Sequence, residues 1–296
     1  NALLALLENP DATLLDLNQL FVDPEYRARV SALVRDQSVK GFLDRELPAY
    51  TDSFLSQVST AIDGNVRRII GNPVIQNIVG HKDSSFNMRQ LLNEKKVIIA
   101  NLAKSKMGND NVRFLGSTLV TRVYDAVFDR AGTNELDLER VPPVYLYIDE
   151  FQSFSNQSFI EMFSEARKYK LNLTIAHQYT GQMAPEVRHA ILGNVGTIIS
   201  FAVGSEDAAI LASQFKPTFD AEDIMALPLA NIYLKLMIDG CTSDPFSALT
   251  LPPLRPQRVS HRDRIIASSR KKYSVQPIVP VANLESVAPP PPQPGG

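Results

Sequence analysis

The spacing of apolar positions changes about a third of the way along the chain. Over residues 1–93 apolar side chains recur every three or four positions, as along the stripe of Phe54, Val58 and Ile62, and none alternates with a period of two. This spacing predicts a mostly helical, all-α region. Pro24 follows an aspartate and predicts a helix start, because proline suits the first helical position and an acid suits the positive helix end.

From Lys96 onward, short apolar runs alternate with helical segments. The runs lie at residues 97–101, 144–148, 173–177, 197–203 and 232–238. A helical stripe follows each of the first four. Continuous apolar strands that alternate with helices are typical of a parallel sheet covered by helices on both faces. We therefore predict an α/β domain over residues 94–251.

The end of the chain has a different composition. Ten of the 20 prolines lie between Pro252 and Pro294, which predicts an extended, disordered, proline-rich tail over residues 252–296. Within it, residues 255–272 carry seven basic side chains against the single acid Asp263. Such a run attracts nucleic acid, a membrane surface or an acidic partner, or it is only a solvated linker.

Composition excludes several classes of protein. The 296 residues are 44% hydrophobic and 21% charged, which allows a sizeable core and argues against wholesale disorder. Cys241 is the only cysteine, so neither an intrachain disulfide nor a thiolate metal cage can form. No apolar run approaches the roughly 20 residues that span a bilayer. We expect a soluble globular protein from a reducing compartment.

The strongest chemical signal is the segment VYLYIDEFQSF at residues 144–154. A buried strand there brings Asp149 and Glu150 to its carboxyl end, where open α/β sheets bind their ligands. In a nucleotide-hydrolysing site, one such carboxylate helps to hold Mg²⁺ through water and the other orients the attacking water. The alternative is a pair of acids in the turn after a core strand.

Two further residues follow from the same strand–helix–strand pattern. Gln178 ends the next apolar strand, 29 residues after Asp149, so both strand ends are expected at one sheet edge. There Gln178 is suited to bind a γ-phosphate or the attacking water, or else to satisfy the turn backbone. Arg167 lies near the end of the intervening helix, where it complements the helix dipole or reaches a neighbouring subunit's nucleotide.

The motifs IDEFQSF, SEARKYKLNLTIAHQY, GNVGTIISFAVGSEDA and LPLANIYLKLMIDG, in this order, resemble the motor domain of type IV secretion coupling proteins. These TraD/TraG-type conjugative DNA-transfer ATPases are related to HerA and FtsK translocases. The segment NLAKSKMGNDNVRFLGSTLV and the helices before it are also similar to this family. The resemblance covers approximately residues 10–251.

The resemblance implies a partial RecA-like P-loop NTPase core, in an ATPase that uses ATP and Mg²⁺. It implies a ring, usually a hexamer, that moves DNA through its centre, with relaxase and type IV secretion components as further partners. By position, Asp149 and Glu150 become the Walker B pair, with Asp149 facing Mg²⁺ through water. Gln178 becomes the γ-phosphate sensor, and Arg167 becomes the arginine finger in trans.

The chain departs from the family pattern in two respects. Ala202 stands where many relatives carry an arginine, so that role is absent or filled elsewhere, for example by Arg188. No glycine is followed by lysine, whereas a P-loop needs Gly-Lys-Ser/Thr to hold phosphates. In the family that loop precedes the helical insertion, so we expect it, and any membrane anchor, upstream of Asn1. We expect part of a longer cytoplasmic motor, inactive alone, which a membrane anchor would hold at the inner face of the cell membrane.

Other assignments stay open at this point. Lys104, Lys106 and Arg113 bracket the loop after the first predicted strand and are suited to DNA phosphates, or else form a solvated surface. Arg188 is a further candidate for a contact with nucleic acid. A HerA-like translocase for DNA resection or packaging is an alternative to a conjugative motor. A non-hydrolysing adaptor that docks relaxase or signal proteins is another.

The family's strand order makes one more prediction. The P-loop strand lies between the strands expected at residues 173–177 and 197–203. If these strands keep their family positions, a gap of roughly 9–10 Å separates them instead of the usual 4.7–4.9 Å. Ile175 should then not pair with Ile199.

Overall fold

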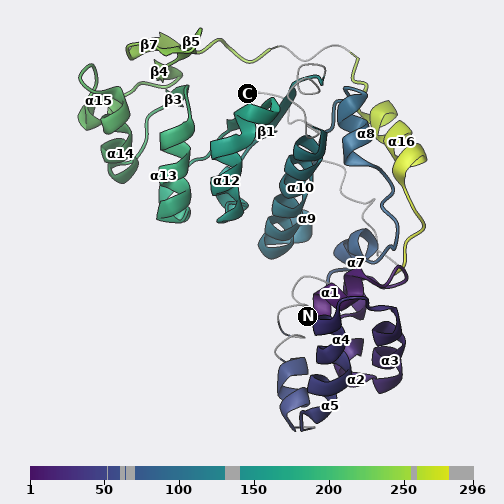
Figure 1. The fold of residues 1–296 in the computed structure, drawn as a ribbon. Helices are drawn as coiled ribbons and strands as arrows, with labels where there is room; N and C mark the ends of the chain where they lie inside the picture. Colours follow the sequence, from purple (N-terminus) through teal and green to yellow (C-terminus); the bar gives the residue numbers. More distant parts are fainter. Residues whose placement is uncertain (52, 61–63, 65–70, 131–140, 255–258, 280–296) are drawn as a thin grey trace. The chain divides into compact units, whose positions relative to one another are not determined.

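The computed structural model describes residues 1–51, 53–60, 64, 71–130, 141–254 and 259–279. They form two compact units (Figure 1). The first comprises residues 1–86, 103–111 and 264–296, and the second comprises residues 87–102 and 112–263, in each case over their described residues. The division predicted at residues 93 and 251 stays a prediction.

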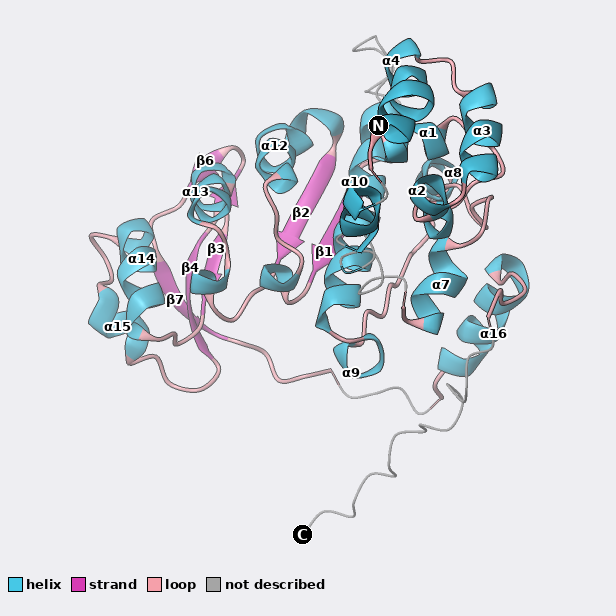
Figure 2. Cartoon of the chain, turned by 90° about the horizontal axis from the view of Figure 1, so that it is seen from below, coloured by secondary structure: helices cyan, strands magenta, loops and turns pink. Residues whose placement is uncertain are grey.

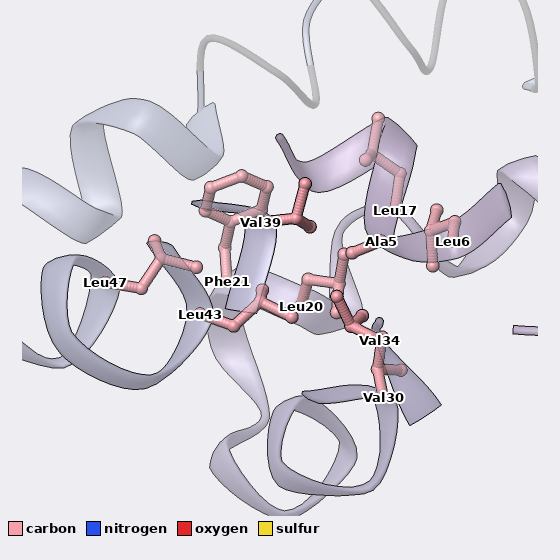
Figure 3. Close-up of a cluster of buried hydrophobic side chains, with 10 residues drawn as sticks. All are labelled: Ala5, Leu6, Leu17, Leu20, Phe21, Val30, Val34, Val39, Leu43 and Leu47. Carbon is pink, nitrogen blue, oxygen red and sulfur yellow. The ribbon is translucent and has the colours of Figure 1, made fainter. Parts of the chain in front are cut away.

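The first unit is helical in its described part, as predicted for residues 1–93. Its helices are α1 (Ala2–Leu7), α2 (Gln19–Val22), α3 (Pro24–Leu33), α4 (Gln37–Gly41), α5 (Leu47–Ala49), α7 (Pro73–Val79) and α9 (Lys104–Met107). Apolar side chains from α1 to α5 converge in one buried cluster (Figure 3). Its members are Ala5, Leu6, Leu17, Leu20, Phe21, Val30, Val34, Val39, Leu43 and Leu47.

The start of α3 shows how local sequence sets these helices. Asp23 is the N-cap, and its carboxylate accepts two backbone N–H groups of the first turn at 2.9 and 3.0 Å. Pro24 occupies the first helical position, as predicted. Arg27, one turn later, is buried, and its guanidinium donates to two backbone carbonyls of α2 at 2.8 and 3.0 Å. These bonds satisfy a charged group that burial alone would destabilise.

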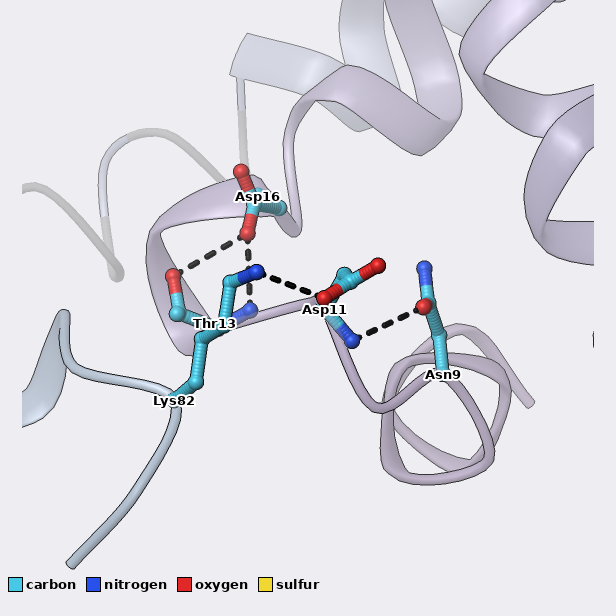
Figure 4. A network of polar contacts seen from close by, with 5 residues as sticks. All are labelled: Asn9, Asp11, Thr13, Asp16 and Lys82. Atoms are coloured by element: carbon cyan, nitrogen blue, oxygen red, sulfur yellow. Dashed lines mark hydrogen bonds and ion pairs between the residues drawn. The ribbon is translucent and has the colours of Figure 1, made fainter.

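A polar network fixes the loop after α1 (Figure 4). The hydroxyl and N–H of Thr13 both donate to Asp16, at 3.0 and 2.7 Å. Lys82 forms an ion pair with Asp11 at 2.5 Å, and the N–H of Asp11 donates to Asn9 at 3.1 Å. Because Lys82 and Asp11 are exposed, this ion pair contributes little to stability.

The prediction of a disordered tail is wrong for residues 262–279. Residues 262–273 form the helix α16 (Arg262–Tyr273), which contains no proline and is rich in helix formers. The Tyr273 ring packs edge-on against Phe86, with 6.2 Å between centroids. The Asn77 amide accepts the N–H groups of residues 278 and 279 at 2.6 and 3.0 Å and donates to a carbonyl at 2.9 Å. The proline-rich end of the tail lies outside the described residues.

The second unit combines helices and strands. Its helices are α8 (Met88–Asn93), α10 (Asn109–Arg130, which begins in the first unit), α12 (Ser158–Glu165), α13 (Pro185–Asn194), α14 (Ser205–Phe215) and α15 (Ala221–Met225). Its strands are β1 (Val144–Ile148), β2 (Leu171–Ile175), β3 (Ile198–Ser200), β4 (Asn231–Lys235), β5 (Met237–Ile238), β6 (Cys241–Thr242) and β7 (Phe246–Leu249). This mixed content agrees with the predicted α/β class.

Only one strand pair in the described residues is parallel. β1 and β2 run parallel, from Val144 opposite Leu171 to Ile148 opposite Ile175, and lie side by side in Figure 2. β3 pairs with β4, and β4 with β7, in antiparallel fashion. The predicted parallel pairing is therefore confirmed for β1 and β2 and wrong for β3, β4 and β7. The run at residues 232–238 divides into β4 and β5, and the chain then turns back to form β7 beside β4, which requires an antiparallel pair.

The helices of this unit cover one face of its strands. α10, α12, α13 and α14 lie on the same side of the strands in Figure 1. On β1, Val144 and Ile148 are buried, whereas Tyr145 and Tyr147 are 62% and 71% exposed. The prediction of helices on both faces is thus wrong for the described residues. In the sequence the tyrosines extend a continuous apolar run, but in the structure they are exposed and only Val144 and Ile148 are buried.

Two further strand predictions have opposite outcomes. Residues 97–101 form no strand, and Val97 and Ile99 are 90% and 83% exposed. An extended segment becomes a strand only when a neighbour pairs with its backbone, and no described strand lies beside this one. β2 and β3 belong to separate sheets, so Ile175 does not pair with Ile199, as expected. The width of the predicted gap stays a prediction.

Candidate functional site

Two carboxylates follow directly after β1. The side chain of Asp149 is exposed, and its Oδ1 accepts the N–H of Glu150 at 2.9 Å. Glu150 has a left-handed backbone, with φ 53° and ψ 41°. This conformation costs a non-glycine residue about 1–2 kcal/mol, and such strain gathers at functional sites.

The Glu150 carboxylate is held by two glutamine side chains. Gln152 donates to its Oε2 at 2.6 Å, and Gln178 donates to its Oε1. Beyond the strand ends, the Ala176 N–H donates to Ile148 and the Phe151 N–H donates to Ala176, each at 2.9 Å. The expected proximity of Gln178 to the carboxylates at one sheet edge is therefore confirmed.

Aromatic packing anchors the turn that carries these acids. Phe151, directly after Glu150, is fully buried and meets the rings of Phe159 and Phe163 at 5.1 and 5.7 Å. Phe154 lies so close to Gly116 of α10 that a Cβ there would stand 2.4 Å from its ring. The core thus fixes the backbone from which Glu150 projects.

The loop after Gln178 makes contacts that the sequence had not revealed. Thr180 is buried, and its N–H and hydroxyl both donate to Asp207, a buried carboxylate in the first turn of α14. The Tyr179 hydroxyl donates to Glu206 in the same turn. From the sequence, the two acids at 206 and 207 indicated only a favourable helix start, because nothing in it places the loop beside α14.

These contacts affect the ionisation of two side chains. Desolvation lowers the pKa of His177, and the nearby Asp207 carboxylate opposes this shift. The hydrogen bond to Glu206 raises the pKa of the Tyr179 hydroxyl, which therefore stays protonated as a donor. At neutral pH the loop presents a neutral imidazole and a neutral phenol beside two acids.

Arg167 does not lie at this site. It is exposed in the turn Ala166–Tyr169, which precedes β2, whereas Glu150 and Gln178 follow the carboxyl ends of β1 and β2. From Lys170 to Ala176 the chain spans roughly 20 Å at about 3.3 Å per residue. Its own guanidinium therefore cannot reach the Glu150 carboxylate of the same chain.

The basic residues proposed for nucleic acid belong to other elements than the carboxylates. Lys104 and Lys106 lie on α9, Arg113 on α10 and Arg188 on α13. Lys104 and Arg113 are exposed. Among the described residues, no hydrogen bond or ion pair joins Arg113 or Arg188 to Glu150. Their role as phosphate contacts stays a prediction.

Two features are absent from the described residues: a cluster of metal ligands and a membrane-spanning helix. No three His, Cys, Asp or Glu side chains within them gather closely enough to hold a metal ion. A metal here would need ligands from a bound nucleotide and water. Nor does any helix in this part combine the length and apolar character that crossing a bilayer requires.

A comparison with protein families matches residues 143–222, which run from β1 into α15, to the model described as the TraM recognition site of TraD and TraG. This segment is similar to the TraD and TraG family. The resemblance found in the sequence is confirmed. The TraD/TraG segment contains Asp149, Glu150, Arg167 and Gln178. No curated protein sequence matches the chain.

Solved structures share the fold of the chain. One is the bacterial conjugative coupling protein TrwBdeltaN70 in an unbound form, with a TM-score of 0.51 and 13% identity over 84% of this chain. Another is the plasmid coupling protein TrwB in complex with ADP and Mg²⁺, with a TM-score of 0.51 and 12% identity over 83%. The chain spans 60% of the length of each. At this identity, the likeness concerns the fold.

Proposed function

We propose that this chain is part of an ATP-driven motor that couples DNA to a conjugative type IV secretion channel. The TraD/TraG segment supports the coupling role, and the TrwB complex with ADP and Mg²⁺ supports nucleotide as the ligand. The observation that carries the proposal is the hydrogen bond of Gln178 to Glu150 at the joined ends of β1 and β2. Parallel strands place ligands at this edge.

Asp149 is the residue suited to Mg²⁺. Its carboxylate is exposed at the strand end, and one oxygen is engaged by the neighbouring N–H. A single carboxylate fits a water-mediated contact, because Mg²⁺ keeps several waters and takes its other ligands from nucleotide phosphates. Bound ATP and Mg²⁺ would supply the phosphoryl group and its charge neutralisation.

Glu150 is the residue suited to orient the attacking water. A carboxylate offers about four acceptor positions, so the two glutamine donors leave room for a water O–H. Gln178 is then within reach of the same water and of a γ-phosphate. During the reaction, Glu150 and Gln178 would exchange their mutual hydrogen bond for hydrogen bonds to the attacking water and the γ-phosphate.

We propose DNA, further copies of this chain and a relaxosome protein as partners. The family model is named for recognition of TraM, which supports a protein partner at the TraD/TraG segment. A ring, of which a hexamer is the family's form, would place Arg167 of one subunit near the nucleotide of the next. Relaxase and secretion-channel components are further proposed partners.

The proposal is tested by Glu150→Gln in the full-length protein. We expect loss of ATP turnover, while ATP and Mg²⁺ still bind, because Asp149 and not Glu150 faces the metal. Turnover is measured by phosphate release, and binding with a fluorescent nucleotide. The matched control is Glu161→Gln on α12, which is exposed and should keep wild-type turnover.

Three outcomes separate the proposal from its alternatives. Wild-type turnover by the Glu150 variant contradicts the site assignment. No turnover by the wild-type protein, with or without DNA, favours a non-hydrolysing adaptor. Turnover stimulated by DNA without any binding to relaxosome proteins favours a HerA-like translocase.

A further inference from the structure

We infer that Asp207 is a positioning residue, which holds Gln178 against Glu150 through its hydrogen bonds to Thr180. The inference rests on the proposed function, because it concerns the same site. It assigns a role to a buried carboxylate on α14, which follows β3, whereas Glu150 and Gln178 follow β1 and β2.

The first observation is the burial of Asp207. Its side chain is among the few charged groups with less than a tenth of their surface exposed, at 4%. Burying a carboxylate is unfavourable unless hydrogen bonds satisfy its oxygens. The described residues provide no ion pair for Asp207. Instead Thr180, which is 7% exposed, donates its N–H to Oδ1 at 3.2 Å and its hydroxyl to the same oxygen.

The second observation is the absence of regular structure between β2 and Thr180. Residues 176–179 belong to neither a helix nor a strand, so contacts alone set the position of Gln178. On one side the Gln178 amide donates to Glu150. On the other side, two residues along the chain, Thr180 is fixed to Asp207.

The third observation is a set of contacts made by Tyr179, the residue after Gln178. The Tyr179 ring lies over Gly181, where an added Cβ would stand 2.6 Å from its hydroxyl oxygen. That hydroxyl donates to Glu206, next to Asp207. The first turn of α14 therefore accepts hydrogen bonds from Tyr179 and Thr180, the two residues directly after Gln178. Without these contacts, Gln178 is held only by the backbone bonds of Ala176 and by its own hydrogen bond to Glu150.

The expected consequence is slower hydrolysis without weaker nucleotide binding. Gln178 would still be present, but it would spend less time beside Glu150. Misplacement of a catalytic group by about 1 Å costs up to about 100-fold in rate. Substrate affinity should change little, since Thr180 and Asp207 are both buried and bonded to each other.

The test compares Thr180→Val with Thr180→Ser in the full-length protein. Valine keeps the shape but removes the hydroxyl donor, so kcat for ATP should fall about 10- to 100-fold while KM stays within about twofold. Serine restores the donor and should return kcat to near the wild-type value. The control is Thr218→Val, in the turn after α14, where the residue is exposed.

A double-mutant cycle with Gln178→Ala tests whether Asp207 and Thr180 act through Gln178. If Asp207 and Thr180 act through Gln178, Gln178→Ala/Thr180→Val should be no slower than Gln178→Ala alone. Losses that multiply would overturn the inference, as would wild-type kcat in Thr180→Val. If Gln178→Ala itself turns over ATP like the wild type, the proposed function of this site and the inference fail together.

A second variant keeps the test decisive if Thr180→Val does not fold. Asp207→Asn retains an oxygen that accepts from Thr180 but removes the charge that strengthens both hydrogen bonds. Its kcat should lie between those of Thr180→Ser and Gln178→Ala, again with KM nearly unchanged. A wild-type kcat in Asp207→Asn, or a kcat loss matched by a KM rise, would overturn the inference.

Discussion

The environment of Glu150 differs from that of an acid in an ordinary turn. Turn acids satisfy nearby backbone N–H groups, as Asp149 does for its neighbour at 2.9 Å. Glu150 instead receives two side-chain amides, from Gln152 and Gln178, on a left-handed backbone. Two side-chain donors on one carboxylate support the proposed site more than the alternative of two turn acids.

Sequence reasoning found the residues that follow strand ends and missed those that support them. Asp149, Glu150 and Gln178 could be predicted because strand ends are visible as the ends of apolar runs. Thr180 and Asp207 could not, since their contact joins positions 27 residues apart across two sheets. Only the tertiary fold decides which loop meets the first turn of α14.

Replacement of His177 should reduce the pH dependence of stability. Its lowered pKa means that the folded state binds the proton less readily than the unfolded chain does. The stability contributed by neutral His177 is thus fully present above the ordinary value of 6.5 and is lost as pH falls below it. Between about pH 7.5 and about pH 5.5, the urea midpoint should fall less in His177→Gln than in the wild type.

The control for this measurement is His189→Gln. His189→Gln replaces an exposed histidine on α13, outside the loop at residues 176–180. An equal fall of the urea midpoint in wild type and His177→Gln would contradict the prediction.

At the scale of elements, helices were predicted more reliably than strands. α10 follows from a stripe at three- and four-residue spacing, and a helix satisfies its own backbone. A strand depends on a partner that a local pattern does not specify. Residues 97–101 have the apolar composition of a strand but no described neighbour, and β7 has a partner in β4 without having been predicted.

Two helix glycines should respond to alanine with opposite signs. Alanine favours a helix by about 1 kcal/mol, but at Gly116 its Cβ would stand 2.4 Å from the ring of Phe154. Overpacking costs about 1–3 kcal/mol, so Gly116→Ala should lower the free energy of unfolding by up to about 2 kcal/mol. Gly193 on α13 has no atom within 4 Å of an added Cβ, so Gly193→Ala should raise it. Urea unfolding measures both.

Gly116→Ala in the Phe154→Ala background tests whether the Phe154 ring causes the destabilisation. With the ring removed, Gly116→Ala should become stabilising by about 1 kcal/mol, as helix propensity alone predicts. Persistent destabilisation in this background would show that another contact of α10, and not the Phe154 ring, requires glycine.

At the scale of the whole molecule, the position of Arg167 limits how it can act. The site lies after the carboxyl ends of β1 and β2, and Arg167 lies before the amino end of β2. An arginine side chain cannot bridge the length of a strand. A role at a nucleotide therefore requires a second copy of the chain, so this residue connects the proposed catalysis to assembly.

Mixing two inactive variants of the full-length protein tests that connection. Arg167→Ala should lower turnover about 1,000-fold or more, and Lys168→Ala, its exposed neighbour, should not. If Arg167 acts in trans, an Arg167→Ala subunit beside a Glu150→Gln subunit forms a site with both wild-type groups. Random mixing in equal amounts creates this arrangement at about a quarter of the interfaces of a ring, so about a quarter of wild-type turnover should return. If Arg167 acted within its own chain, every site would lack one group and no ratio would restore turnover, because complementation requires the two groups to come from different subunits.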